Sequence, residues 1–407
     1  MIHRVEGGVT APAGFRASGV ACGIKRRREG SSSAPLDLAL VVADEPVAAA
    51  AMFTTNKAVA APVIVSREHL ALSGGRVMAI AANAGCANAC TGHAGLEVAC
   101  GVAAAAAAVL GCAREQVLVA STGVIGVPLD LRKMQDGITA GAAQLSVAGH
   151  EAATRAIMTT DPFPKSLAVV VETPDGPLRV GGMAKGSGMI EPRLATMLAF
   201  LTTDARVDPA VLGQALKTVV DRSFNAITVD GECSTNDCVI ALASGKSGVP
   251  IARSDDARFL EALSAVAAHL AREIVRGGEG ATKVVNVRVT GAESVADAWL
   301  AARTISNSPL VKTAVHGGDP NWGRLVAAAG RSGAAFSLDH ASVTIGSVPL
   351  LTDGVPHDER APEAAAVLQA TEITLSVDLG TGGHHEATMW TCDFSAEYVR
   401  INAEYRT

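Results

Sequence analysis

The segment from Phe259 to Lys283 places the strongest constraint on the fold of this chain. Its apolar residues fall four, three, four and four positions apart, which is the spacing of one face of an α-helix. These residues are Phe259, Leu263, Val266, Leu270 and Ile274. Gly277 and Gly278 then end the helical pattern, so residues 279–283 are expected to form a tight loop that leads into a strand.

Other parts of the chain mix the same two patterns. A second helix is predicted from Asp208, as the N-cap, and Pro209, as the first helical residue, to about Arg222, and a third over residues 292–305. Strands are predicted at 36–42, 117–120, 167–172, 226–229, 239–242 and 284–290. Because strands and helices do not alternate regularly, the pattern favours an α+β protein.

The chain is too long for a single core of ordinary size. Its 407 residues make two domains the default expectation, with room for a small third one. Hydrophobic residues make up 49% of the chain but aromatic residues only 3%. The core must therefore be packed from alanine, valine, leucine and isoleucine.

Several classes of function are disfavoured by composition. The basic cluster Lys25–Arg28 is followed at once by Glu29 and is not interleaved with aromatic residues, so no nucleic-acid partner is expected. The most apolar stretch, 98–113, is shorter than the ~20 residues of a membrane span and is expected to be a buried helix. Arg4 and Glu6 interrupt the start of the chain, so a cytoplasmic protein with no membrane partner is expected.

Metal and nucleotide sites are also disfavoured. The eight cysteines include no C-x-x-C pair and are expected to be reduced, buried thiols. His384 and His385 would point to opposite faces of a strand, so no metal ligand set is expected. Residues 244–247 resemble the end of a P-loop, but Ile240 occupies the position of its first glycine. Residues 380–383 are better explained as a turn.

The segment 185–198, Lys-Gly-Ser-Gly-Met-Ile-Glu-Pro-Arg-Leu-Ala-Thr-Met-Leu, contains the bond between Ala195 and Thr196. It resembles the self-cleavage segment of the ornithine acetyltransferase family of arginine biosynthesis, which includes bifunctional glutamate N-acetyltransferases. The resemblance implies that Thr196 becomes a new N-terminus. An N-terminal threonine carries a hydroxyl nucleophile and, in its α-amino group, a base that titrates near neutral pH.

Two glycine-containing segments extend the resemblance. Residues 121–126, Ser-Thr-Gly-Val-Ile-Gly, follow a predicted strand and offer a hydroxyl and glycine backbone. By resemblance Thr122 and Gly123 form the oxyanion hole, which stabilises negative charge in the transition state. A turn at the end of the strand, with glycine supplying a positive φ, is the alternative interpretation. Residues 316–324, His-Gly-Gly-Asp-Pro-Asn-Trp-Gly-Arg, resemble a signature of the same family.

Further positions match the substrate contacts of the family one by one. They are Thr159 (in Thr159-Thr-Asp161), Lys185, Thr196, Glu279, Asn402 and Thr407. We assign Lys185 to a substrate carboxylate and Glu279 to a cationic amine, each as a charge-assisted contact.

Two segments depart from the family pattern. Cys86 stands where the family commonly has asparagine, and Glu232-Cys233 stand where it has Asp-Thr. These departures leave the preferred acceptor open.

The resemblance implies a fold and a reaction. It implies a layered αββα nucleophile domain, residues 1–283, and a smaller C-terminal α+β domain, residues 284–407. Cleavage would give α (1–195) and β (196–407) chains in an α2β2 heterotetramer. Thr196 would take the acetyl group of N-acetylornithine and pass it to glutamate, with no cofactor. Whether acetyl-CoA also serves as donor is left open.

Three alternatives stay open. An amidohydrolase or aminopeptidase with an N-terminal nucleophile would use the same groups but release the acyl group to water. A relative that serves a specialised pathway would keep the cleavage and use another acceptor. A binding protein would show no cleavage at all.

Overall fold

The computed structural model describes residues 2–26, 33–191 and 197–404 and divides the chain into two compact units. Unit 1 holds the described residues up to Asn225 together with Glu232–Ile274. Unit 2 holds Ala226–Gly231 and the described residues from Val275 onward. The domain boundary predicted after residue 283 is not tested by this division and stays a prediction.

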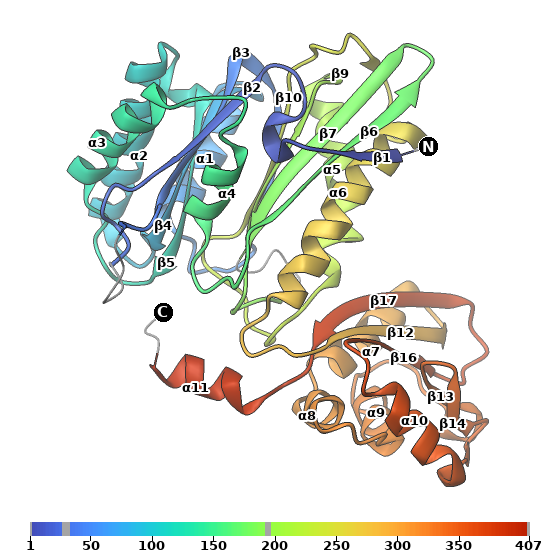
Figure 1. Cartoon of the computed structure of the whole chain (residues 1–407). Coiled ribbons are helices and arrows are strands. Elements are labelled where there is room, and N and C mark those ends of the chain that lie inside the picture. The colour runs from blue at the N-terminus through green and yellow to red at the C-terminus, as the bar shows by residue number, and fades with distance from the viewer. Residues whose placement is uncertain (1, 27–32, 192–196, 405–407) are drawn as a thin grey trace. The chain divides into compact units, whose positions relative to one another are not determined.

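Unit 1 is built on a nine-stranded sheet (Figure 1). The strand order is β1-β6-β7-β8-β10-β3-β4-β5, with β2 paired to β3. The strands are β1 Ile2–Val5, β2 Phe15–Val20, β3 Leu38–Phe53, β4 Arg76–Cys86, β5 Val117–Val124, β6 Lys165–Thr173, β7 Gly176–Lys185, β8 Leu198–Thr203 and β10 Cys238–Ala243. The short strands β9 Arg206–Val207 and β11 Pro250–Ile251 pair with each other.

The helices of unit 1 lie between these strands along the chain. They are α1 Ala61–Leu72, α2 Gly92–Leu110, α3 Leu131–Ala143, α4 His150–Ile157, α5 Pro209–Asp221 and α6 Ala257–Arg276, with 3₁₀ turns η1 Gly8–Thr10, η2 Arg114–Gln116 and η3 Phe224–Ala226. The structure confirms the predicted helices at α5, with Asp208 at its N-cap, and α6.

The two halves of the sheet share one core. Leu118 of β5 and Ile80 of β4 belong to the same cluster as Phe200 of β8 and Ile240 of β10, and α4 contributes Ile157. Helices cover the outer faces. The helices α1, α2 and α3 pack in a second cluster against β3, β4 and β5. Helix α6 packs so closely on β7 that a Cβ added to Gly182 of β7 would meet Val266 and Leu270 of α6. This order of layers confirms the predicted layered α+β fold.

Strand β3 runs far beyond the predicted residues 36–42. Its segment 38–43 is fully buried, and successive side chains alternate between the two cores, with Leu40 in one and Val41 in the other. A strand covered on both faces reads as a continuous apolar run. The sequence therefore predicted that this strand exists but not that it extends to Phe53.

The ends of three strands lie together in the middle of the sheet. β8 pairs antiparallel with β7, with Lys185 opposite Leu198, and parallel with β10, with Leu198 opposite Cys238. The last residue of β7, the first of β8 and the first of β10 therefore lie side by side, where these three central strands end or begin.

Helix α2 differs from the expected buried helix over 98–113. It begins at Gly92, ends where Gly111 adopts a left-handed conformation, and buries only one face, on which Ala99, Ala103 and Ala106 lie. Within the described residues it is the one helix long and apolar enough, by length and composition, to cross a membrane. Its buried face packs with α1, α3 and strand β5.

Unit 2 contains a six-stranded sheet of order β15-β14-β13-β16-β12-β17. The strands are β12 Val284–Ala292, β13 Ser342–Ile345, β14 Val348–Thr352, β15 Val355–Pro356, β16 Glu372–Asp378 and β17 His385–Cys392. The helices are α7 Val295–Ser306, α8 Pro309–Gly317, α9 Trp322–Gly330, α10 Ala361–Val367 and α11 Ala396–Glu404, with 3₁₀ turns η4 Leu338–His340 and η5 Asp358–Arg360. α7, α8 and α9 share one apolar core with β12, β13 and β16.

The strand predicted at 226–229 is wrong. Phe224–Ala226 form a 3₁₀ turn, and Ile227 makes only an isolated bridge to Trp390. Thr228 donates its hydroxyl to Asn307 Oδ1 at 2.7 Å. This segment is apolar because Ile227 and Val229 are buried, and burial alone does not distinguish a strand from an irregular segment.

Candidate active site

The predicted oxyanion residues lie at the end of β5, beside the end of β4. Thr122 is buried, and Gly123 pairs with Gly85 at an irregularity of the β4–β5 ladder. Gly123 has a φ of 128°, and a Cβ there would lie 2.4 Å from the carbonyl carbon of Gly85. Only glycine fits this position, both because of its φ and because of the close approach.

Lys185, the last residue of β7, reaches Thr122. Its side chain is buried, with 2% of the residue exposed, and Nζ donates to Thr122 Oγ1 at 3.2 Å. A hydroxyl that accepts through its oxygen keeps its own hydrogen for another acceptor. The ammonium therefore leaves Thr122 able to donate, and its positive charge favours negative charge nearby.

Asp161 connects this lysine to Thr159. One carboxylate oxygen accepts from the Thr159 N–H at 2.9 Å, and the other accepts from the Gly186 N–H at 2.8 Å and from the buried Lys165 ammonium. Burial alone would raise the pKa of Asp161, but the charges of Lys165 and Lys185 outweigh it and lower this pKa to about 2. The carboxylate thus fixes the Thr159 loop to the end of β7.

The cleavage bond itself, between Ala195 and Thr196, lies outside the described residues. The residue after it does not: the Met197 N–H donates to Asp237 Oδ1 at 2.8 Å. Asp237 has no exposed surface, and burial raises its pKa well above the ordinary value of 3.8 although Met197 and Lys185 act in the opposite direction.

No sequence pattern assigned a role to Asp237. The signal that could have found it is the polar run 234–237 directly before the wholly apolar strand β10.

The departures from the family pattern lie beside these groups. Cys86 pairs with Thr122 and Val124 across the ladder, and its thiol faces the Val127 carbonyl at 3.2 Å. Burial raises the pKa of this thiol, so it is a neutral, packed group. Cys233 accepts at its carbonyl from Asn56 Nδ2 at 2.8 Å.

Unit 2 brings together the two other described residues of the predicted site. Asn402, on α11, donates from Nδ2 to Glu279 Oε2 at 2.9 Å. Only 8% of Glu279 is exposed. Thr407, the last predicted contact, lies outside the described residues.

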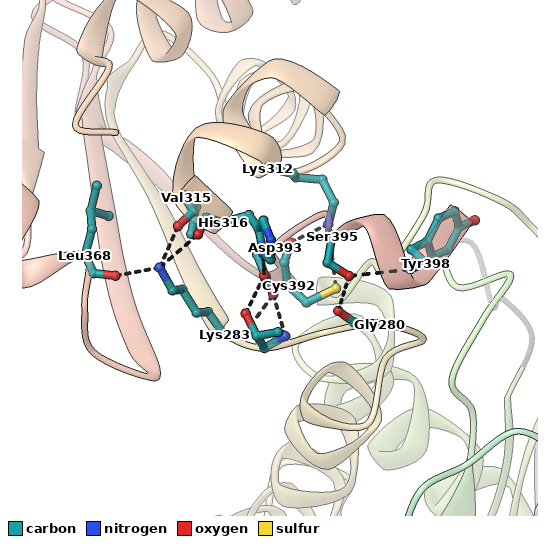
Figure 2. A network of polar contacts seen from close by, with 11 residues as sticks. Gly280, Lys283, Lys312, Val315, His316, Leu368, Cys392, Asp393, Ser395 and Tyr398 are labelled. Atoms are coloured by element: carbon teal, nitrogen blue, oxygen red, sulfur yellow. Dashed lines mark hydrogen bonds and ion pairs between the residues drawn. The ribbon is translucent and has the colours of Figure 1, made fainter. Parts of the chain in front are cut away.

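The 316–324 signature forms the connection from α8 to α9 rather than an open loop. Gly318 ends α8 in a left-handed conformation, and the Asn321 side chain caps α9 by accepting from the Arg324 N–H. His316 points to Asp393, as Figure 2 shows, with Nδ1 2.7 Å from Oδ2. In the part of the chain that the structure describes, no group of three or more His, Cys, Asp or Glu side chains is placed to hold a metal ion.

Comparison with known proteins agrees with the family resemblance of the sequence. The chain is 49% identical over 408 residues to the arginine biosynthesis bifunctional protein ArgJ of Symbiobacterium thermophilum, with 99% of both chains covered. It is 47% identical to the protein of that name from Thermosynechococcus vestitus, covering 100% of this chain and 99% of that one.

Two solved structures are also similar. The Bacillus halodurans ArgJ crystal structure has 41% identity and a TM-score of 0.49, covering 51% of this chain and 98% of that chain. The ornithine acetyltransferase of Mycobacterium tuberculosis, complexed with ornithine, has 39% identity and a TM-score of 0.41, covering 47% and 98%.

The relatives that match over the whole length are bifunctional proteins of arginine biosynthesis. The model of the ArgJ family matches residues 16–407, and the chain belongs to this family. The resemblance found in the cleavage segment is therefore confirmed. The roles of the individual site residues stay predictions.

Proposed function

We propose that this enzyme transfers the acetyl group of N-acetylornithine to glutamate through an acetyl-Thr196 intermediate, after cleaving its own chain between Ala195 and Thr196. The observation that carries the proposal is the group of buried polar residues beside the start of β8. Lys185 contacts Thr122 there, and Asp237 holds the amide of Met197, the residue after the proposed nucleophile.

In the precursor, the Thr196 hydroxyl attacks the carbonyl carbon of Ala195. The carbon–nitrogen bond then breaks, the amide nitrogen takes a proton, and an ester joins Ala195 to the Thr196 oxygen. Water hydrolyses this ester to give the α chain (1–195) with a free carboxylate and the β chain (196–407) with a free α-amine. That amine is the base that the mature Thr196 needs.

In the mature enzyme, the amine takes the hydroxyl proton as Thr196 attacks the acetyl carbonyl of N-acetylornithine. The negative oxygen that forms accepts from the Thr122 hydroxyl and the Gly123 N–H. The lysine contact supports this role, because Lys185 donates to the Thr122 oxygen and leaves its hydrogen free to point at the oxyanion. Ornithine departs with the proton, and the amine of glutamate then attacks acetyl-Thr196 by the reverse path.

Donor and acceptor share an α-amino-acid core, with an α-carboxylate and an α-nitrogen, so one set of contacts can serve both half-reactions. We assign Lys185 to the substrate carboxylate and Glu279 to a cationic amine. Asn402 orients the Glu279 carboxylate through one oxygen, which leaves the other oxygen for the amine. Thr159 and Thr407 complete the proposed substrate contacts.

The remaining expectations belong to the same proposal. No cofactor takes part, and the same assay, run with acetyl-CoA in place of N-acetylornithine, tests whether acetyl-CoA also serves as donor. The cleaved chains assemble as an α2β2 heterotetramer in the cytoplasm.

The test compares Thr196→Ala and Thr196→Ser with a control at Thr352, an exposed threonine of β14 changed to alanine. Thr196→Ala should run as one uncut chain without activity, because it lacks the hydroxyl for both reactions. Thr196→Ser should cut at least partly, and the control should match the unmodified enzyme. Intact mass and a denaturing gel report cleavage.

Turnover with and without glutamate distinguishes transfer from hydrolysis. We expect N-acetylornithine alone to acetylate the β chain, with ornithine release continuing only when glutamate is present. Continuous release of acetate without glutamate would instead identify a hydrolase, and normal fragments from Thr196→Ala would overturn self-cleavage by this residue.

A further inference from the structure

A buried carboxylate in unit 2 binds the loop that carries Glu279. Asp393 follows directly after β17, and its side chain has no exposed surface. Its Oδ1 accepts from the N–H groups of Thr282 and Lys283 at 2.7 and 2.8 Å. Its Oδ2 accepts from the Thr282 hydroxyl at 2.6 Å. The same oxygen faces His316 Nδ1 at 2.7 Å (Figure 2).

These four contacts use the whole acceptor capacity of a carboxylate. Burial by itself would raise the pKa of Asp393, but the hydrogen bonds from Thr282 and His316 outweigh it and lower this pKa. Asp393 is therefore held as an anion by groups from two separate parts of the chain, residues 282–283 and His316. A neutral side chain of the same shape cannot satisfy all of these donors.

The same loop is tied a second time to the start of α11. Ser395 donates its hydroxyl to the Gly280 carbonyl at 2.6 Å and accepts from the Tyr398 N–H at 3.4 Å (Figure 2). Gly280 has a φ of 67°, and a Cβ there would lie 2.4 Å from the Tyr398 nitrogen. The loop backbone and the first turn of α11 are thus packed directly on each other.

Helix α8 also contacts the 279–283 loop and the end of β17. Lys283 Nζ donates to the Val315 and Leu368 carbonyls, both at 2.7 Å, and the buried Lys312 Nζ donates to the Cys392 carbonyl. His316, the first residue of the 316–324 signature, sits at the end of this helix and contributes one of the Asp393 contacts. The signature therefore has a use that requires no ligand.

We propose that Asp393 is a positioning residue for the amino-acid substrates, acting through Glu279 and Asn402. Glu279 leads into the loop that Asp393 holds, and Asn402 lies two turns into the helix that starts from Ser395. Their 2.9 Å contact joins the two ends of one assembly whose centre is the Asp393 carboxylate. This inference rests on the proposed substrate roles of Glu279 and Asn402.

The test is the steady-state kinetics of Asp393→Asn with N-acetylornithine and glutamate. We expect KM for both substrates to rise about tenfold, kcat to stay within about twofold, and the yield of cleaved fragments to be unchanged. The matched control is Asp378→Asn. Asp378 is another carboxylate of unit 2, it accepts from Thr290 Oγ1 and the Gly380 N–H at 2.9 Å, and it does not touch the 279–283 loop. Its KM values should equal those of the unmodified enzyme.

Further variants distinguish the ways in which the idea can fail. Glu279→Gln and Asn402→Ala should each raise KM, and Asp393→Asn combined with Asn402→Ala should exceed the larger single effect by no more than about twofold, because both act on one contact. Unchanged KM in Glu279→Gln and Asn402→Ala would refute the substrate assignments themselves. Raised KM in those two with unchanged KM in Asp393→Asn would refute only the positioning role.

A milder variant covers the case in which Asp393→Asn does not accumulate as folded protein. Ser395→Ala removes only the hydroxyl between Gly280 and α11. It should raise KM for both substrates by severalfold at unchanged kcat. A KM equal to that of Asp378→Asn would overturn the inference.

Discussion

Replacing Asp161 by asparagine should destabilise unit 1 by about 3–5 kcal/mol, because it leaves the Lys165 ammonium buried without its anion. Neither side chain of this pair has exposed surface. The ring of Phe163 lies 5.0 Å from Lys165 Nζ, but a cation–π contact returns only about 1–2 kcal/mol. The loss therefore exceeds what the neighbouring groups can offset.

The acid dependence of stability gives an independent check on this pair. The pKa of Asp161 falls from the ordinary value of 3.8 to about 2 in the folded protein. A carboxyl whose folded-state pKa is lowered stabilises the fold above its unfolded pKa and loses that contribution as the pH falls through its folded pKa. The shift corresponds to about 2 kcal/mol, present above about pH 4 and lost on approach to pH 2. Asp161→Asn should abolish this part of the pH dependence.

The assay is native-state hydrogen exchange, read by mass spectrometry in peptides from β6 and β7, together with urea unfolding. Asp204→Asn is the matched control: burial raises the pKa of Asp204, so its charge does not stabilise the fold, and the variant should cost less than about 1 kcal/mol. Adding Lys165→Met to Asp161→Asn should restore at least half of the loss, since no buried charge remains. Equal protection in Asp161→Asn and Asp204→Asn would refute the reasoning.

Two further variants test groups beside the proposed nucleophile. Gly123→Ala should reduce transfer by about a hundredfold or more, because its Cβ would lie 2.4 Å from Gly85 and displace an oxyanion donor. The control is Gly126→Ala, because Gly126 also has a positive φ but a Cβ there would meet no atom within 4 Å. Equal kcat/KM in the two variants would contradict the oxyanion assignment. Asp237→Asn keeps an acceptor for the Met197 amide and should cleave like the unmodified precursor, whereas Asp237→Leu should cleave more slowly. A time course of fragment yield measures both cleavage rates. Equal rates in the two variants would show that cleavage does not need the Met197 contact.

Local patterns predicted the elements whose structure is local. The spacing from Phe259 to Ile274 was enough for α6, because a helix bonds residues four apart and its buried face repeats with the same period. The glycine pair and the strand after it were likewise visible in order, and β12 begins at Val284. The extent of β3 was not visible, since its length depends on which strands cover it.

The contacts of the site could not be predicted from patterns of this kind. Lys185 and Thr122 are 63 positions apart and meet only because β7, β8, β10, β3, β4 and β5 are ordered as they are in one sheet. Asp237 and Asp393 are single carboxylates that each accept from backbone N–H groups, which every residue except proline offers. The family resemblance named residues for which substrate contacts are predicted, and it gave no sign of Asp237 or Asp393.

The strand order has a consequence for the two products of cleavage. β8 and β10 belong to residues after Thr196, and both neighbours of this pair, β7 and β3, belong to residues before it. β8 pairs with β7 through six residues, and β10 pairs with β3 through six more. The α and β chains would therefore be interleaved within one hydrogen-bonded sheet, like the two halves of a split protein. Neither could be withdrawn without opening the core of the other, so they should co-purify as one particle under native conditions and separate only when unfolded.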